Sequence, residues 1–261
     1  MTVAVSKALE ADARAVVCAS TGNTAASAAA YAARAGLAAV VLQPEGAVAL
    51  GKLAQAQAHG ARVLEVRGSF EQALDAAREL AARGTHALVN SLNPYRLEGQ
   101  KTAVFEILEE LGGPPDLLVL PYGGGGNTVA YLKGFAEAGA GLPRLIAAEA
   151  SDRAHTAASA IRIAEPVHRA EVEASGADVI AVGDERILEW WRALAQAEGL
   201  FCEPSSAAGL AALEAERPVR GTRVVCVITG HGLKDPGSVA QAVPPPVPVD
   251  PDPDAIAKAA G

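Results

Sequence analysis

Short apolar runs alternate with longer alanine-rich or amphipathic segments over most of the chain. Runs such as 15–19 and 38–42 have the length of buried strands, whereas segments such as 24–34 and 70–82 have the length of helices. This alternation is typical of parallel sheets whose strands are joined by crossover helices. The pattern predicts strands at 15–19, 38–42, 62–66, 87–89, 117–120, 145–148, 179–182 and 224–229, helices at 24–34, 50–59, 70–82, 97–111, 185–198 and 205–216, and a further helix opening at Asn127.

A turn at Asn93–Pro94 divides this series of elements. We expect the chain to leave a smaller sheet for a larger one there. The predicted fold class is therefore α/β, with two open, twisted, mostly parallel sheets and flanking helices. The predicted domains are a small mobile α/β domain at 17–95 and a larger α/β domain formed by 1–16 and 96–240. A high density of prolines predicts an extended, unpacked tail at 241–261.

Composition and charge narrow the class of protein. The 261 residues are 50% apolar and carry a formal net charge of −8, which argues against a nucleic-acid or anionic-membrane partner. The most apolar helical segment, 24–35, is far shorter than the roughly 20 residues that cross a bilayer, and no secretory signal is evident. Cys18, Cys202 and Cys226 lie far apart in apolar runs, which favours reduced, buried thiols over disulfides or metal ligands. We expect a cytoplasmic enzyme or binding protein without a metal site.

Polar loops follow several predicted strands, at the sheet edge where open parallel sheets bind ligands. The first is Ser20-Thr21-Gly22-Asn23-Thr24, directly after a strand and at a helix start. Small hydroxyl groups and free backbone N–H groups at a helix N-terminus suit an anion such as a carboxylate. The alternative is a helix N-cap alone, for which one polar residue would be enough.

The second loop, Gly123 to Gly126 followed by Asn127 and Thr128, lies between a strand and a helix. Four glycines let the backbone approach a ligand closely, and the N–H groups of the helix point into the same space, so we predict a phosphate site. The spacing is neither that of a GxxxxGK[ST] loop nor that of a dinucleotide fingerprint. A flexible linker is the alternative, but linkers rarely join a strand to a helix.

Three further segments carry candidate groups. Thr229 ends the last predicted strand, and its hydroxyl could hydrogen-bond a ring nitrogen without requiring protonation of that nitrogen. Asn90, Ser91 and Arg96 gather amide, hydroxyl and guanidinium groups after another strand, and Arg96 could bind a second phosphate or a carboxylate. The segment 203–207 is interpreted locally as a helix start, and His231 by itself is weak evidence for catalysis.

Together these segments resemble the fold-type-II pyridoxal 5′-phosphate (PLP) enzymes and, within them, the threonine synthases. The matching stretches occur in the family's order from Met1 to about Pro236. The serine-threonine-glycine-asparagine loop and the glycine loop are common to the superfamily, whereas Asn90-Ser91 with Arg96 and the Gly-His-Gly-Leu-Lys-Asp segment at 230–235 are more specific to threonine synthase. The stretches are 19–25, 89–101, 123–127, 202–207 and 229–235.

The resemblance implies PLP as the cofactor, an amino-acid substrate and a homodimer, although no local feature marks an interface. It implies that the reaction removes the phosphate of O-phosphohomoserine and adds water to give threonine, with PLP as the electron sink. It also implies roles for individual residues: Asn23 at the phenolic oxygen of PLP; Gly123, Gly124, Gly125, Gly126 and Asn127 at the PLP phosphate; Thr229 at the ring nitrogen; Ser20, Thr21 and Thr24 at the substrate carboxylate; Asn90, Ser91 and Arg96 at the substrate phosphate.

The catalytic lysine of the family has no counterpart in these residues. The family carries it in a serine-phenylalanine-lysine-aspartate-arginine-glycine segment immediately before a helix that resembles 1–10, and here Met1 stands just past that position. None of the lysines present lies in such a motif. The resemblance therefore implies an N-terminally truncated member without a catalytic residue, and we expect no turnover by these 261 residues alone. The lysines are Lys7, Lys52, Lys101, Lys133, Lys234 and Lys258.

Three functional hypotheses remain open from the sequence. The first is a threonine synthase whose start codon is placed too late or whose gene is truncated. The second is a non-catalytic relic or partner subunit that binds PLP or phosphate reversibly. The third is a related PLP lyase such as a threonine or serine dehydratase, against which Arg96 with Asn90 and Ser91 argues, because such a substrate carries no phosphate.

Overall fold

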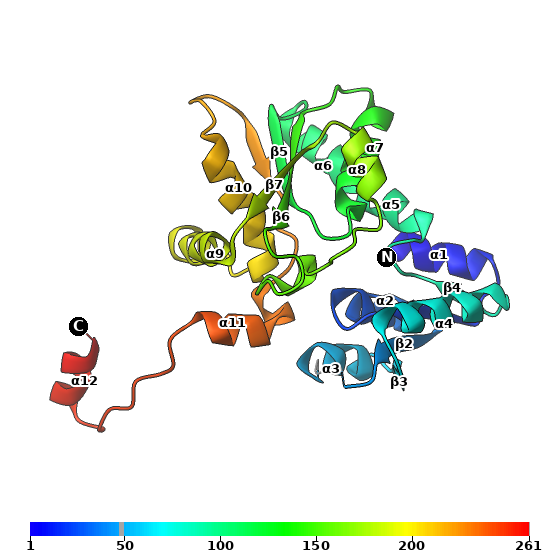
Figure 1. The fold of residues 1–261 in the computed structure, drawn as a ribbon, viewed down its shortest axis with the longest axis horizontal. Helices are drawn as coiled ribbons and strands as arrows, with labels where there is room; N and C mark the ends of the chain where they lie inside the picture. Colours follow the sequence, from blue (N-terminus) through cyan, green and yellow to red (C-terminus); the bar gives the residue numbers. More distant parts are fainter. Residues whose placement is uncertain (47–49, 261) are drawn as a thin grey trace.

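The computed structural model describes residues 1–46 and 50–260 and contains two four-stranded sheets with helices on both faces of each (Figure 1). All strand pairs within the sheets are parallel. The prediction of an α/β fold with two open, mostly parallel sheets and flanking helices is confirmed. Within the part of the chain that the structure describes, no helix is long and apolar enough to cross a bilayer.

The first sheet has the strand order β3-β2-β1-β4. Alternate residues of its central strand face opposite sides, as strand geometry requires. Val16 and Cys18 pack with α1, α2 and α3, whereas Val17 and Ala19 pack against α4. The bounds are α1 (Thr2–Glu10), β1 (Ala15–Ala19), α2 (Asn23–Ala35), β2 (Ala38–Pro44), α3 (Leu50–Ala58), β3 (Arg62–Val66), α4 (Phe70–Ala82) and β4 (His86–Leu88).

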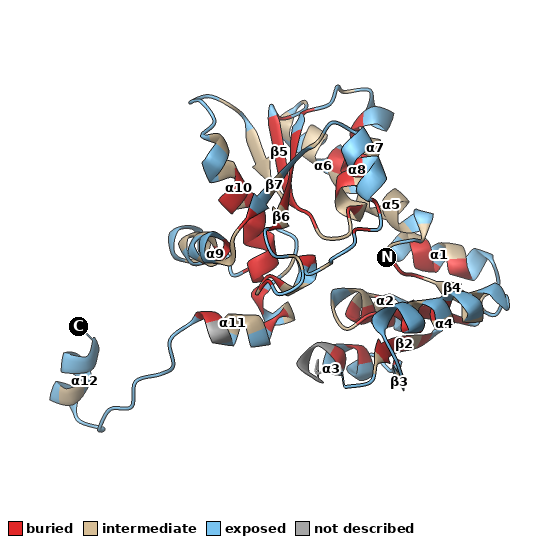
Figure 2. Ribbon diagram, in the orientation of Figure 1, coloured by how far each residue is buried: buried red, intermediate tan, exposed pale blue. Residues whose placement is uncertain are grey.

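The second sheet has the order β7-β6-β5-β8. Leu118 and Leu120 of its central strand pack with α6, α7 and α8, and Val119 packs with α9 and α10 on the other face. Figure 2 shows β5 and β6 as buried over most of their length. The bounds are α6 (Thr102–Leu111), β5 (Leu117–Pro121), α7 (Gly126–Ala138), β6 (Arg144–Ala150), α8 (Arg169–Ala174), β7 (Asp178–Val182), α9 (Asp184–Glu198), α10 (Ala208–Glu216) and β8 (Val224–Cys226), with the 3₁₀ turns η1 (Ser159–Ile161), η2 (Pro204–Ala207) and η3 (Gly232–Lys234).

Two helices at the passage between the sheets differ from the prediction. The single helix expected at 97–111 is divided into α5 (Pro94–Gln100) and α6, with a break at Lys101. The start at Pro94 has a clear cause, because the Asn93 side chain accepts the Tyr95 N–H at 2.9 Å as an N-cap. At the break α7 comes very close, since a Cβ on Gly134 would lie 2.7 Å from the Lys101 carbonyl oxygen.

The first helix and the tail complete the described chain. The buried residues of α1, Ala4, Val5 and Ala8, belong to the apolar cluster of the first sheet. The division of the chain into domains at 17–95 and at 1–16 with 96–240 stays a prediction. The tail was expected to be extended, but after α11 (Pro236–Ala242) it carries the helix α12 (Pro253–Ala260), which stands away from the body in Figure 1.

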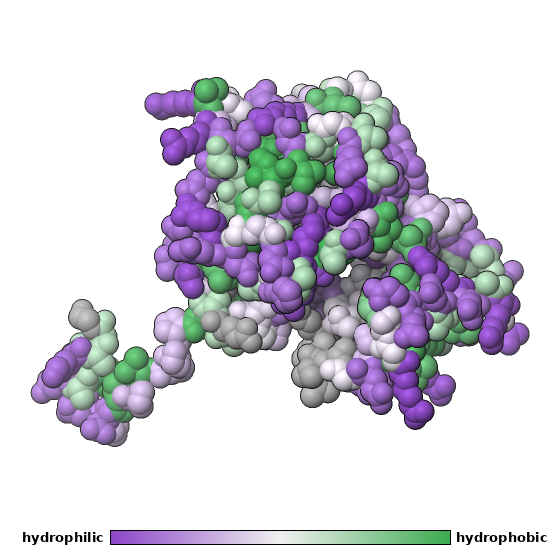
Figure 3. Space-filling view, in the orientation of Figure 1, coloured by the Kyte–Doolittle hydropathy of each residue, from purple (hydrophilic) through white to green (hydrophobic). Residues whose placement is uncertain are grey.

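The surface is mainly hydrophilic on the face shown in Figure 3, where hydrophobic residues form small separate groups. One group lies over the edge strand β7, whose Val179 is exposed. The three cysteines are free thiols, as predicted, with Cys18 and Cys202 buried and Cys226 half-buried. Burial raises the pKa of Cys18 to about 12 and the pKa of Cys202 and of Cys226 to about 11.

Candidate functional site

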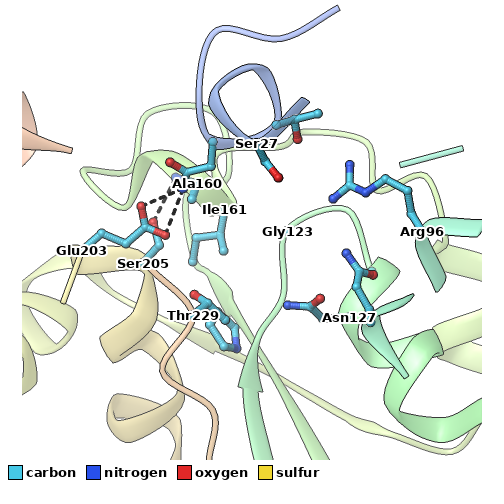
Figure 4. Close-up of a pocket in the computed structure, with 14 residues that line it drawn as sticks. Ser27, Arg96, Gly123, Asn127, Ala160, Ile161, Glu203, Ser205 and Thr229 are labelled. Carbon is cyan, nitrogen blue, oxygen red and sulfur yellow. Dashed lines mark hydrogen bonds between the residues drawn. The ribbon is translucent and has the colours of Figure 1, made fainter. Parts of the chain in front are cut away.

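A cavity of about 370 Å³ lies where polar loops from both sheets meet (Figure 4). Its walls come from the start of α2, from α5, from the loop between β5 and α7, from η1 and from the segments around η2 and Thr229. The carboxyl ends of parallel strands bring these loops together, as expected for an open α/β sheet. The lining residues are Asn23, Thr24, Ser27, Arg96, Gln100, Pro121, Gly123, Gly125, Asn127, Ala160, Ile161, Glu203, Ser205 and Thr229.

The glycine loop forms one wall of this cavity, and at Gly123 and Gly125 it is packed too closely to admit a side chain. A Cβ on Gly123 would lie 3.0 Å from the Ala160 carbonyl oxygen, and one on Gly125 would lie 3.0 Å from the His168 Cβ. Gly125 also has a left-handed backbone, with φ of +88°, and is the N-cap of α7. The loop therefore presents backbone at a helix N-terminus, which is a general way to hold a phosphate.

Thr229 lies at the opposite wall, where Ser206 orients its hydroxyl. Ser206 Oγ accepts the backbone N–H groups of Thr229 at 3.2 Å and of Gly230 at 2.9 Å. Ser206 Oγ also lies 2.9 Å from Thr229 Oγ1, where either hydroxyl can be the donor, and 3.5 Å from the Gly230 carbonyl oxygen. These contacts hold the Thr229 hydroxyl at the cavity wall.

Asn23 and Glu203 approach each other across the mouth of the cavity. Asn23 Nδ2 donates to Glu203 Oε2 at 3.0 Å and lies 3.4 Å from Oε1 (Figure 4 shows the carboxyl end of this contact). Glu203 is only 3% exposed. This hydrogen bond could not be predicted from the sequence, because Asn23 and Glu203 are 180 positions apart.

Arg96 projects toward the cavity from α5 in Figure 4. Its Nη1 lies 3.4 Å from the Val89 carbonyl oxygen, and its buried Nε has no hydrogen-bond partner among residues 1–46 and 50–260. Burial lowers the pKa of Arg96. Among the described residues no salt bridge involves Arg96. A partly desolvated guanidinium of this kind fits an anionic ligand.

Several residues predicted for the site lie beside the cavity instead of on its wall. Ser20 Oγ accepts the N–H groups of Gly22 at 3.2 Å and Ala25 at 3.3 Å, and so shapes the loop before α2. The Asn90 amide donates one of its two N–H groups to the Ala19 carbonyl at 2.8 Å and accepts the Ala19 N–H at 2.9 Å. Asn90 thus has a structural contact and does not line the cavity, and its predicted contact with a substrate phosphate stays a prediction. Thr21, Ser91, Gly124 and Gly126 belong to the same loops but do not line the cavity.

Other lining residues were missed by the sequence analysis, chiefly Ser27, Gln100, Glu203 and Ser205. Gln100 lies four positions after Arg96, so both side chains lie on one face of α5. Its buried Oε1 has no hydrogen-bond partner, like Arg96 Nε. This i, i+4 spacing beside a predicted phosphate contact is the signal that could have identified Gln100.

The lining residues of the described chain include no lysine. Lys7 pairs with Glu10, Lys101 with Glu137 and Lys133 with Glu98, all in ion pairs. Lys234 Nζ donates to Gln55 Oε1 at 2.6 Å.

Comparison with known proteins assigns the chain to one family. The model of the family described as pyridoxal-phosphate dependent enzyme matches residues 1–230. The threonine synthase of Halalkalibacterium halodurans is 46% identical over 93% of this chain and 75% of its own length. That of Synechocystis sp. is 49% identical over 92% of this chain and 69% of its own length.

The chain belongs to the threonine synthase family of PLP-dependent enzymes. The threonine synthase of Methanocaldococcus jannaschii is also similar, at 42% identity over 95% of this chain and 69% of its own length. The resemblance found in the sequence and the prediction of PLP as the cofactor are confirmed.

Solved structures show the same fold at low identity. Maize serine racemase superposes with a TM-score of 0.75 and 24% identity, covering 89% of this chain and 77% of its own. Tomato (Solanum lycopersicum) threonine deaminase isoform 2 superposes with a TM-score of 0.77 and 20% identity, covering 92% of this chain and 73% of its own. These structures confirm the fold class of this threonine synthase family member and carry no argument about its substrate.

The cavity of this family member fits PLP on structural grounds. The glycine loop is a cradle that side chains would fill, and α7 directs its N-terminus at it. Thr229 offers a hydroxyl donor and Asn23 offers an amide, while Arg96 has an unpartnered buried donor for a second anion. These donors suit a phosphorylated ring together with a phosphorylated substrate.

Proposed function

We propose that this cavity binds PLP and O-phospho-L-homoserine, and that the site is built for their conversion with water to L-threonine and phosphate. The observation that carries the proposal is Arg96, whose buried Nε lacks a partner in a cavity that already contains a glycine loop for the cofactor phosphate. Two separate anion-binding walls fit two phosphate groups better than one. The similarity to curated threonine synthases supports this assignment.

The cofactor is held by groups from both sheets. The backbone of Gly123 to Gly126 and the side chain of Asn127 would hold its phosphate at the start of α7, the Thr229 hydroxyl would hydrogen-bond the ring nitrogen, and Asn23 would contact the phenolic oxygen. A hydroxyl can donate to a ring nitrogen without requiring that nitrogen to be protonated. PLP supplies an electron sink at the substrate's α carbon when it is bound.

The substrate is oriented by its two anionic ends. Arg96 receives the phosphate and lines the cavity together with Gln100 on the same face of α5. Thr24 receives the carboxylate at the start of α2, where the helix N-terminus favours negative charge, and Ser20 and Thr21 shape the loop before it. Asn90 and Ser91 lie in the loop before α5, beside the cavity lining.

Ligand binding tests the proposal whether or not the chain turns over. The purified chain is titrated with PLP, and O-phospho-L-homoserine or L-threonine is then added while the absorption spectrum of bound PLP is followed. We expect O-phospho-L-homoserine to bind at least tenfold more tightly than L-threonine, and Arg96→Lys to remove most of this difference because a lysine cannot form the two-pronged contact. Equal binding of the two, with keto-acid release from threonine, would instead indicate a dehydratase.

A second candidate function is reversible PLP binding without catalysis. Borohydride treatment of the PLP-loaded chain, followed by mass spectrometry, separates the two candidates. Uptake of PLP without a reduced lysine adduct supports the non-catalytic binder. A stable adduct at one lysine excludes it.

Three coarser expectations complete the proposal. The domain division at 17–95 against 1–16 with 96–240 is tested by limited proteolysis, which should cut first near its boundaries. A homodimer is tested by sedimentation velocity. A cytoplasmic location is tested by cell fractionation.

A further inference from the structure

Glu203 is held rigidly beside Thr229. Its backbone N–H donates to the Gly230 carbonyl at 2.8 Å, and the flanking Cys202 pairs with His231 in a β-bridge. These contacts hold the backbone of Glu203 beside that of Gly230, which follows Thr229.

The carboxyl group of Glu203 lies where a side chain at position 230 would lie, and Gly230 has none. A Cβ on Gly230 would lie 2.2 Å from Glu203 Oε1 and 2.3 Å from its Cδ. The Glu203 side chain makes no hydrogen bond to cap the following turn η2, so its place is not explained by a helix start. It turns instead to the cavity and to Asn23.

The contact with Asn23 settles which way that amide faces. The two ends of an asparagine amide are nearly isosteric, but a carboxylate can only accept, so the Nδ2 side must face Glu203. One Nδ2 hydrogen is then used by Glu203, and the second hydrogen and Oδ1 remain for a ligand. Hydrogen bonds to a charged acceptor are stronger than neutral ones, so this orientation is well fixed.

We propose that Glu203 is a positioning residue that orients the Asn23 amide toward the cofactor and joins the two sheets across the cavity. It acts through Asn23, and its effect on the cofactor rests on the proposed PLP site. The Asn23–Glu203 contact joins two protein side chains, so it can be measured on the protein alone. The two parts can therefore be tested separately.

The first test uses the ligand-free full chain. Unfolding in urea is measured for the wild type, Asn23→Ala, Glu203→Gln and the double variant. We expect Glu203→Gln to lower the folding equilibrium constant roughly tenfold in the wild type and about twofold or less when Asn23 is already alanine. Equal effects in the two backgrounds would show that Glu203 does not act through Asn23, and would overturn the proposal without any reference to PLP.

The second test adds PLP and measures its dissociation constant by equilibrium dialysis and its bound form by visible circular dichroism. We expect Glu203→Gln to weaken PLP binding roughly fivefold to tenfold and to change the dichroism band, with no further effect when Asn23 is alanine. Gly230→Ala should act likewise, because its methyl group displaces the carboxyl group while both partners remain. The exposed Glu189, paired with Arg186 on α9, provides the control, and Glu189→Gln should change neither measurement.

These outcomes distinguish the positioning role of Glu203 from the proposed cofactor site. Coupling in urea without PLP uptake by the wild type refutes the proposed cofactor site but leaves Glu203 as the residue that orients Asn23. PLP uptake that is unchanged in Glu203→Gln and Gly230→Ala refutes the positioning role while the cofactor site stands. If Glu203→Gln fails to fold, Gly230→Ala carries the same comparison.

Discussion

Gly125 provides the sharpest test of the phosphate-binding loop, because its neighbour Gly124 is a matched control. Gly125 has φ of +88°, and an added Cβ would lie 3.0 Å from the His168 Cβ and 3.2 Å from Val172 Cγ2. At Gly124 the backbone carries no such restriction, and the nearest atom is Ile163 Cδ1 at 3.7 Å, an ordinary contact. The two substitutions add the same methyl group to the same loop.

The expected cost follows from these contacts. A left-handed backbone costs a non-glycine residue roughly 1–2 kcal/mol, and overpacking adds roughly 1–3 kcal/mol. Gly125→Ala should therefore lower the free energy of unfolding by about 2–5 kcal/mol, a loss that all but the least stable domains survive, since domains typically have about 5–15 kcal/mol. Gly124→Ala should change it by less than about 0.5 kcal/mol.

Urea unfolding of the ligand-free chain, followed by far-UV circular dichroism, gives both values. A PLP titration then shows whether the loop still forms its cradle, and we expect Gly125→Ala to weaken binding at least tenfold, which corresponds to about 1.4 kcal/mol. If both variants lose the same stability and the same affinity, the close packing of Gly125 is not what shapes the loop, and the reasoning is refuted.

Three further predictions concern neighbouring groups. Asn90→Ala should lower the free energy of unfolding, measured in urea, by roughly 2–4 kcal/mol, because it leaves the buried N–H and carbonyl of Ala19 without partners. If stability is unchanged and phosphate binding is weaker, Asn90 contacts the substrate instead. His168→Ala should weaken O-phospho-L-homoserine binding more than PLP binding in calorimetry, since His168 Nε2 lies 3.3 Å from the Ser91 carbonyl; equal losses would count against this link. The pKa of Cys18 is raised from 9.0 to about 12 in the folded protein, so the unfolded chain loses the thiol proton first as the pH rises. The stabilisation from the neutral buried thiol is therefore complete below pH 9 and is lost between pH 9 and 12. At pH 10 the loss is about 1.4 kcal/mol, and the unfolding free energy of Cys18→Ala should fall less between pH 8 and pH 10 than that of the wild type; parallel curves would contradict this.

Most of the fold could be predicted because its strands are short apolar runs bounded by polar or glycine residues. The strands at 15–19 and 62–66 have the predicted bounds. The single helix predicted at 97–111 was wrong, because the helix is broken at Lys101, where Gly134 of another helix approaches the Lys101 carbonyl closely. The helix α12 was missed because proline density hid a local start signal, in which Asp252 Oδ2 accepts the Ala255 N–H at 2.9 Å.

The candidate site was predicted in outline but not in its detailed contacts. Residue type and position near strand ends were enough to predict the glycine loop, Asn23, Arg96 and Thr229, and all of them contribute to one cavity. The sequence could not show that the Asn90 amide is taken up by a backbone 71 positions away. Nor could it show that Glu203 turns from its own helix start toward Asn23. Both are tertiary contacts that leave no local pattern.

The orphaned donor of Arg96 means that ligand recognition and thermodynamic stability oppose each other on α5. Removing a guanidinium from water carries a desolvation penalty that destabilises the ligand-free fold. An apolar side chain of similar volume, such as methionine, would pack there without this penalty. Arg96→Met should therefore melt at a higher temperature than the wild type and gain nothing from added phosphate, whereas the wild type should gain. The anion acts as a missing component of this part of the protein, which reaches its full stability only when the ligand arrives.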